Sequence, residues 1–220
     1  MSKNNFSYTK EKQSDSFEIE FDYFSLDRKN SKQLFLLLHG FSQRGESLMK
    51  KLSPILPQDA AILSPNAPFP APYKTDSGYL EAYAWYFYLA KDNRFVIPPG
   101  PAIKALKKLI AKLGYDKLPI TIIGFSQGGY LAPVVAKEMN VKHIIAVSAD
   151  YLARYYSKDD KFKLDAIHGA KDEVSPIEIS KKNLADLKAE LGLNATFHEL
   201  PNTRHEVDEA AIKVIAKILS

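Results

Sequence analysis

The sequence contains no cysteine and no long apolar run. The lack of cysteine excludes a disulfide framework, thiolate metal sites, redox dithiols and a cysteine nucleophile. No window reaches the roughly 18 consecutive apolar residues of a membrane-spanning helix. Residues 1–16 are polar and lack the apolar stretch of a signal peptide. We therefore expect a cytoplasmic protein without stable membrane insertion.

A strong excess of one charge is also missing. Lys and Arg total 30 against 26 Asp and Glu, and the positive residues are scattered along the chain. This distribution does not indicate a nucleic-acid partner. With 45% hydrophobic and 25% charged residues, the 220-residue chain has an ordinary globular composition and enough length for one sizeable core. We expect a flexible polar tail over residues 1–16 and a single domain over residues 17–220.

Apolar stretches of strand length alternate with helical patterns along the chain. Strands that are apolar throughout fit a sheet covered on both faces, and the intervening helices provide right-handed crossovers. The pattern predicts an α/β fold with a mostly parallel central sheet and helices on both faces. The first strand alternates apolar and polar residues, which places it near a sheet edge. The predicted strands cover residues 16–26, 33–38, 60–63, 119–123, 143–147, 162–167 and 195–200, and the predicted helices cover residues 45–56, 103–113, 130–139, 177–191 and 207–218.

The most informative motif follows the predicted strand 119–123. Residues 124–129 read Gly-Phe-Ser-Gln-Gly-Gly and fit the pattern G-x-S-x-G, in which the serine lies on a tight strand-to-helix turn with its hydroxyl exposed. Open parallel sheets carry their chemistry beyond the carboxyl ends of the strands, where this turn lies. The alternative is a glycine-rich turn with a capping serine. The motif predicts that Ser126 is a nucleophile.

A serine nucleophile requires a histidine base that is held by an acid. Of the five histidines, His205 lies in a loop beyond a predicted strand, and the other four lie within strands or at strand ends. Asp172 also follows a predicted strand, so the chain order Ser126, Asp172, His205 is the one that hydrolases of this architecture use. Glu173 and Asp150 are alternative acids. The alternative role of Asp172 is that of a turn or helix-capping residue.

Acyl transfer also requires N–H donors that stabilise the developing oxyanion. The backbone N–H of Gln127, directly after Ser126, is one candidate. The second candidate is the N–H of Phe41, in the loop that follows the predicted strand 33–38. The alternative for this second position is a simple tight turn.

Together these motifs resemble the phospholipase/carboxylesterase family of α/β-hydrolases, which includes bacterial carboxylesterases and acyl-protein thioesterases. The likeness extends from about Gln33 to the C-terminus and is most specific at residues 124–129, which match the family's GFSQGG at every position. The resemblance implies that Ser126, Asp172 and His205 form the triad. The supporting motifs are Leu38-His39-Gly40, Pro65-Asn66-Ala67-Pro68, Trp85-Tyr86 in place of Trp-Phe, and His168-Gly169 with Asp172 and Pro176.

The chain departs from the family in three places. After His39-Gly40 the family usually has a further Gly and Asp, whereas residues 41–44 are Phe-Ser-Gln-Arg. This difference predicts a different shape for the oxyanion loop. Arg204 replaces the glycine that usually precedes the catalytic histidine and adds a charge near the mouth of the site. The residues around Asp150 differ from the usual Ser-Gly, so Asp150 stays a second acidic candidate.

Aromatic residues concentrate in one segment, because nine of them fall between Phe69 and Phe95. The segment also contains several prolines and follows a predicted strand whose end faces the site. Two interpretations are open. The segment walls an acyl pocket or caps Ser126, or it packs into the core. Within it, Trp85 and Tyr86 are our candidates for substrate binding.

These observations predict a serine hydrolase of carboxylic esters or thioesters with small to medium acyl chains. The reaction would proceed through an acyl-enzyme on Ser126 and would need no metal or organic cofactor. The expected partner is a small-molecule ester or thioester, with acylated lipids and proteins as further candidates. Two other classes remain open: an acyltransferase or lactone hydrolase with the same triad, and a non-catalytic binding protein of the same fold.

Overall fold

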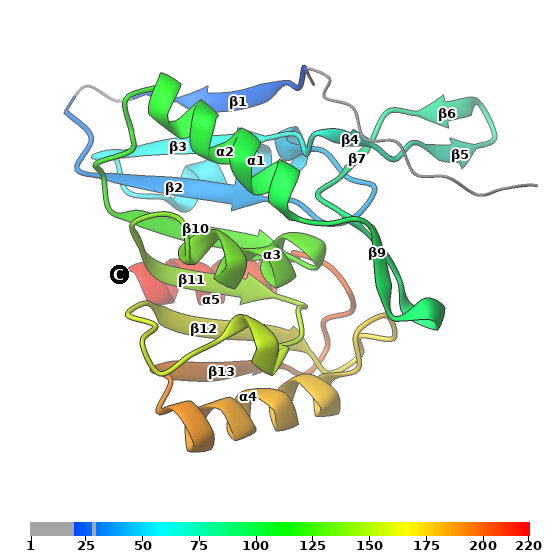
Figure 1. The fold of residues 1–220 in the computed structure, drawn as a ribbon, viewed down its shortest axis with the longest axis vertical. Helices are drawn as coiled ribbons and strands as arrows, with labels where there is room; N and C mark the ends of the chain where they lie inside the picture. The colour runs from blue at the N-terminus through cyan, green and yellow to red at the C-terminus, as the bar shows by residue number, and fades with distance from the viewer. Residues whose placement is uncertain (1–19, 28–29) are drawn as a thin grey trace, which may run out of the picture.

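A seven-stranded sheet with the order β1-β3-β2-β10-β11-β12-β13 forms the middle of the protein (Figure 1). The computed structural model describes residues 20–27 and 30–220, so the predicted tail over residues 1–16 lies outside the described residues. Strand β1 pairs antiparallel with β3 at one edge, and the other neighbouring strands pair parallel. The predicted mostly parallel sheet is therefore confirmed. The strands are β1 (Tyr23–Leu26), β2 (Gln33–Leu38), β3 (Ala60–Pro65), β10 (Ile120–Phe125), β11 (Val141–Val147), β12 (Lys163–Gly169) and β13 (Ala195–Leu200).

Helices cover both faces of this sheet, as predicted. Successive strand residues face opposite sides, so Leu36 belongs to a core shared with Leu106, whereas Leu37 belongs to a core shared with Ile215. The first core lies under α2 (Gly100–Lys112), α3 (Gln127–Ala136) and α4 (Ile177–Leu191), and the second lies under α1 (Gly45–Leu52) and α5 (Glu209–Leu219). No helix in the part of the chain that the structure describes is long and apolar enough to span a membrane.

Several element boundaries differ from the predicted ones. Strand β1 begins at Tyr23 rather than at residue 16, and residues 17–19 lie outside the described part. Helix α1 ends at Leu52 and passes into a 3₁₀ turn, because Pro54 lacks the N–H that would continue an α-helix. Helix α5 begins at Glu209, since the side chain of Asp208 caps it by accepting the N–H of Ala211 at 2.9 Å.

The aromatic segment forms three small antiparallel sheets beyond the carboxyl ends of the strands (Figure 1). Both interpretations of this segment apply, to different residues. Trp85 is fully buried in the core, whereas Tyr86, Phe87 and Tyr88 line a cavity together with Ser126. The projecting β5–β6 hairpin does neither, and its Tyr79 is 73% exposed. The pairs are β4 (Phe69–Pro70) with β7 (Tyr83–Ala84), β5 (Tyr73–Thr75) with β6 (Gly78–Leu80), and β8 (Phe87–Leu89) with β9 (Arg94–Ile97).

Two glycines allow the elements around the site to approach closely. A Cβ atom on Gly128 would lie 2.1 Å from the carbonyl oxygen of Leu38, so α3 starts directly against the end of β2. A Cβ atom on Gly169 would lie 2.2 Å from the carbonyl oxygen of Thr203, so the end of β12 meets the loop that carries His205. The sequence thereby brings three loops together at one edge of the sheet.

Candidate active site

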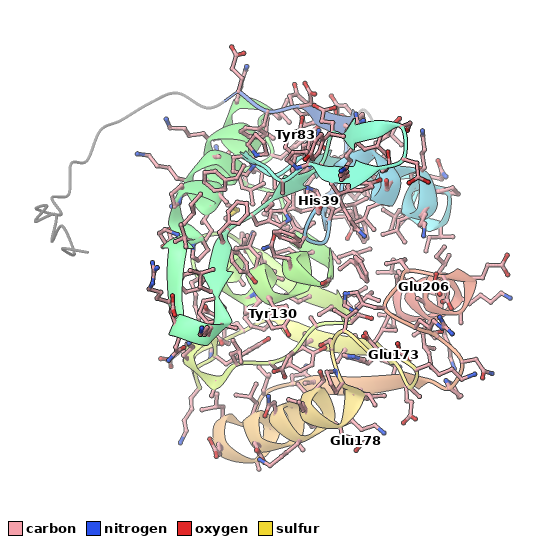
Figure 2. The ribbon with its side chains drawn as sticks, turned by 90° about the vertical axis from the view of Figure 1, so that its right-hand side faces the viewer. His39, Tyr83, Tyr130, Glu173, Glu178 and Glu206 are labelled. Atoms are coloured by element: carbon pink, nitrogen blue, oxygen red, sulfur yellow. The ribbon has the colours of Figure 1, made fainter. Side chains whose placement is uncertain are left out.

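Three predicted side chains form a continuous hydrogen-bonded chain at the carboxyl edge of the sheet. The hydroxyl of Ser126, after β10, lies 2.9 Å from Nε2 of His205, in the loop before α5. Nδ1 of His205 lies 2.8 Å from Oδ2 of Asp172, in the loop after β12. Figure 2 looks onto this edge and shows Glu173 and Glu206, the sequence neighbours of Asp172 and His205, on adjoining loops. The geometry fits a histidine that accepts the serine proton through Nε2 and is held through Nδ1.

The backbone at Ser126 is strained. Its φ of 47° and ψ of −116° lie outside the regions that L-residues favour. The strand before the turn and the helix after it impose this conformation, and the N–H of Ser126 donates to the carbonyl of Val147 at 2.9 Å. The turn directs the side chain toward His205 instead of into the helix. Such strain costs about 1–3 kcal/mol and persists where the surrounding structure enforces it.

Asp172 is buried and ionised. Burial alone would raise the pKa of this carboxyl group, but the N–H of Ser175 and the imidazole of His205 lower the pKa below its ordinary value. Oδ1 accepts the N–H groups of Val174 and Ser175, and Oδ2 faces His205. The fully buried His168 donates through Nε2 to the carbonyl of Ser175 at 2.7 Å and so fixes the same loop. Asp172 therefore offers a fixed negative charge to His205.

The two alternative acids lie elsewhere. Oδ1 of Asp150 accepts the N–H of Tyr151 at 2.7 Å and the side-chain amide of Asn183 at 2.8 Å. Glu173 is exposed and follows Asp172 in the same loop. The structure thus brings Asp172 to His205 and brings neither Asp150 nor Glu173 there.

The loop after β2 turns sharply at Ser42. Ser42 adopts a left-handed backbone conformation with a φ of 55°, which glycine would favour. Its hydroxyl donates to the carbonyl of Ala71 at 2.7 Å, and Oε1 of Gln43 accepts the N–H of Gly40 at 3.1 Å. These bonds hold the loop where a glycine would otherwise be expected. Phe41 at its tip borders the same cavity as Ser126.

Buried polar contacts of His39 hold the loop after β2 in place. His39 is fully buried, donates through Nδ1 to the carbonyl of Gly40 at 2.7 Å, and accepts the N–H of Ala67 through Nε2 at 2.9 Å. The indole N–H of Trp85 donates to the carbonyl of His39 at 2.8 Å. His39 is therefore a neutral bridge between the loop after β2 and the segment after β3.

Gln127 links the serine turn to the aromatic segment. Its side-chain oxygen accepts the N–H of Trp85 at 2.8 Å, and its side-chain nitrogen donates to the carbonyl of Tyr86 at 2.9 Å. Its own backbone N–H lies in the first turn of α3, where N–H groups have no intrahelical partner. Trp85 is fully buried and lines neither of the two cavities at the site, so it supports the loops around the site from within the core. Tyr86, in contrast, lines a cavity together with Ser126.

The burial of His39 makes stability pH-dependent. Burial lowers the pKa of His39 to about 4, and the hydrogen bond to Gly40 opposes this only in part. In the unfolded chain the pKa is about 6.5. Because the unfolded state binds the proton between these two values, the free energy of unfolding should fall by about 3 kcal/mol as the pH drops through this window.

Urea unfolding of wild type and of His39→Gln at a series of pH values tests this prediction. The glutamine variant lacks the titrating group, while the other titrating groups are shared and cancel in the difference. We expect the difference in unfolding free energy between the two proteins to shrink on acidification. Parallel pH curves would show that His39 is not buried in the neutral form.

Two further histidines belong to a separate ionic cluster. The carboxylate of Asp165 lies 2.7 Å from Nε2 of His143, 2.8 Å from Nε2 of His198 and 2.8 Å from the amine of Lys163. Burial would raise the pKa of Asp165, but these three partners hold it well below its ordinary value. The cluster joins the three neighbouring strands β11, β12 and β13, and its residues have no contact with Ser126. These histidines therefore stabilise the pairing of strands in the sheet.

Two cavities adjoin the Ser126–His205 pair, one lined by Ser126 and the other by His205. The first has a volume of about 400 Å³ and reaches Ser126, and we name it the acyl cavity for the role that we propose for it. The second has a volume of about 370 Å³ and reaches His205, and we name it the leaving-group cavity for its proposed role. The acyl cavity is lined by Phe41, Tyr86, Phe87, Tyr88, Leu89, Ser126, Gln127 and Tyr130, and the polar lining of the leaving-group cavity includes Arg44, Lys51, Glu81 and Glu206.

Several of these residues were not found by sequence reasoning. Tyr130 lies in α3, four residues after the N-cap residue Ser126, so helical spacing is a signal that could have placed it beside Ser126. The role of His39 depends on contacts with Ala67 and Trp85, which are distant in the sequence, and no local pattern indicates it. Arg44 and Lys51 enter the leaving-group cavity because α1 follows the loop after β2.

The sheet order and the strained serine turn between β10 and α3 define an α/β-hydrolase. The chain belongs to the phospholipase/carboxylesterase family, whose model matches residues 25–220. It is therefore an esterase-like serine hydrolase. No curated protein sequence is significantly similar to the chain.

Solved structures with the same fold carry related names. The esterase PE8 is 22% identical with a TM-score of 0.70, covering 91% of this chain and 98% of its own. Acyl-protein thioesterase 2 from Zea mays is 20% identical with a TM-score of 0.65, covering 90% and 97%. A carboxylesterase from Mesorhizobium loti is 17% identical with a TM-score of 0.68, covering 90% and 94%. At these identities the likeness establishes the fold.

Proposed function

We propose that the protein hydrolyses carboxylic esters or thioesters with small to medium acyl chains through an acyl-enzyme on Ser126. The observation that carries the proposal is the hydrogen-bonded chain from Asp172 through His205 to Ser126, with a cavity on each side. Family membership supports ester chemistry in general.

In the first half of the proposed reaction, the Ser126 hydroxyl attacks the substrate carbonyl while Nε2 of His205 takes its proton. The negative charge that develops on the carbonyl oxygen is stabilised by the backbone N–H groups of Gln127 and Phe41. His205 then protonates the leaving alcohol or thiol as its bond to the acyl carbon breaks. In the second half, His205 activates water, which releases the acid and restores the Ser126 hydroxyl. Asp172 stabilises the imidazolium in both halves.

The two cavities suggest how a substrate is oriented. The proton passes from His205 to the leaving group, so the leaving group belongs on the side of His205. The polar leaving-group cavity suits a polar alcohol or thiol, and the largely aromatic acyl cavity suits the acyl chain. Among the described residues, no feature favours acyl transfer, lactone opening or binding without turnover over hydrolysis.

A series of p-nitrophenyl esters of increasing acyl length tests this proposal. Each methylene that enters the acyl cavity contributes about 0.8 kcal/mol, so kcat/KM should rise by up to about fourfold per methylene from acetate to butyrate. It should level off once the chain fills the cavity, so palmitate should be no better than octanoate. The ratio of kcat/KM for each ester to that for the thioester of the same acid gives the preference between oxygen and sulfur leaving groups. Absence of turnover across the series would contradict the proposal, and a rise that continues to palmitate would contradict the acyl size.

A further inference from the structure

One of the tyrosines that line the acyl cavity has a hydroxyl group without a protein partner. Three tyrosines line it, and two of their hydroxyls are occupied: that of Tyr88 donates to Oδ1 of Asn93 at 2.5 Å, and that of Tyr130 interacts with Ser175 and with the backbone of Asp150. Among residues 20–27 and 30–220, the hydroxyl of Tyr86 has no hydrogen-bond partner.

The position of Tyr86 is fixed by the site itself. Its carbonyl accepts the side-chain amide of Gln127, the residue after the nucleophile, at 2.9 Å. Its ring packs edge-on against Phe95 with centroids 5.7 Å apart. Burial raises its pKa, so the hydroxyl stays protonated and is available as a donor at neutral pH. Figure 2 shows Tyr130, whose hydroxyl interacts electrostatically with that of Tyr86, in the middle of the carboxyl edge.

A positive charge lies within electrostatic range of the same hydroxyl. The guanidinium of Arg154 acts on Tyr86 and lies 6.0 Å from the ring centroid of Tyr88 and 5.1 Å from that of Tyr155. Within the described residues Arg154 forms no ion pair with a carboxylate, although Asp186 and Glu190 line a neighbouring cavity with it. An oxygen that accepts from Tyr86 would therefore also be attracted by Arg154.

An unsubstituted alkyl chain in this cavity would remove water from the Tyr86 hydroxyl and offer no acceptor in return. A buried donor without a partner costs free energy, and sites built to hydrogen-bond a substrate group discriminate against analogues that lack it. We propose that Tyr86 makes the enzyme selective for acyl chains that carry an oxygen acceptor, with Arg154 adding attraction where that oxygen belongs to a carboxylate. This inference rests on the proposed esterase function and specifies its substrate class.

Matched methyl esters test the inference. We would compare kcat/KM for the esters of butanoic, hexanoic and octanoic acids, for those of the corresponding ω-hydroxy acids, and for the half esters of the corresponding dicarboxylic acids. The readout is the ratio of the oxygenated ester to the alkyl ester of equal length. For at least one chain length, kcat/KM for the oxygenated ester should equal or exceed that for the alkyl ester in wild type. In Tyr86→Phe, which lacks the hydroxyl but keeps the ring, this ratio should fall about three- to tenfold.

Two further variants sharpen the result. Tyr79→Phe removes a hydroxyl on the exposed β5–β6 hairpin, from a residue that lines neither cavity, so its ratio should match wild type. If Arg154→Gln lowers the ratio of half ester to alkyl ester and leaves the ratio for the ω-hydroxy esters unchanged, the preferred acceptor is a carboxylate. If only Tyr86→Phe lowers the ratios, the preferred acceptor is a neutral oxygen. The inference is overturned if wild type favours the alkyl ester at every length, or if Tyr86→Phe leaves all ratios unchanged. If no ester is hydrolysed at all, the proposed function itself fails.

Discussion

Replacing Ser126 by alanine should lower kcat/KM for a short-chain p-nitrophenyl ester by about 10⁵-fold, because no other group can form the acyl-enzyme. The residual rate would come from substrate binding and the oxyanion donors. Steady-state kinetics on purified wild type and Ser126→Ala give the ratio directly.

The stability of the same variant is its control. Alanine keeps the strained backbone of residue 126, with its φ of 47°, so the free energy of unfolding should stay within about 1 kcal/mol of wild type. A folded Ser126→Ala protein that keeps more than a small fraction of the activity would contradict the assignment of Ser126 as the nucleophile.

Replacing Asp172 by asparagine should lower kcat by about 10³- to 10⁴-fold. The amide removes the negative charge that stabilises the imidazolium of His205 and favours the wrong tautomer of the ring. The N–H groups of Val174 and Ser175 can still donate to an asparagine oxygen, so the loop should keep its conformation.

Asp150→Asn is the matched control for this change. An asparagine at position 150 can still accept from Tyr151 and Asn183, so kcat should stay within about threefold of wild type. The reverse pattern, with a large loss in Asp150→Asn and a small one in Asp172→Asn, would show that the acid has been misassigned.

Much of the fold follows from short-range patterns. The continuous apolar runs of β2, β3 and β10 reflect strands that are covered on both faces, and period and length suffice to find them. The serine turn is equally local, since Gly124 has to be a glycine for β10 and α3 to approach so closely, and Gly128 has to be one for α3 to start against the end of β2. Parallel topology then implies that the residues after these strands meet at one edge.

Other features depend on contacts between distant parts of the chain. Trp85 was a candidate for substrate binding, yet its indole N–H donates to the carbonyl of His39 and its side chain lies in the core. Nothing in the sequence near Trp85 distinguishes it from Tyr86, which faces the acyl cavity. The short strands of the aromatic segment are equally hard to predict, because each has only two to four residues and is held by its partner.

The loop after β2 shows how a local departure from the family sequence can be compensated. Its sequence replaces the usual glycine and aspartate, and the backbone nevertheless turns through a left-handed Ser42. The compensation comes from Ala71, whose carbonyl accepts the hydroxyl of Ser42, and from the side chain of Gln43. Sequence comparison identifies the departure, but only the three-dimensional contacts show what replaces the glycine.

The central claim is that Ser126 is the activated nucleophile of the site. Its most direct test is to treat wild type and Ser126→Ala with a fluorophosphonate probe and to map the modified peptide by mass spectrometry. The account predicts one adduct in wild type, on Ser126, and no adduct in Ser126→Ala. An unlabelled wild-type protein, or an adduct on another residue, would contradict it.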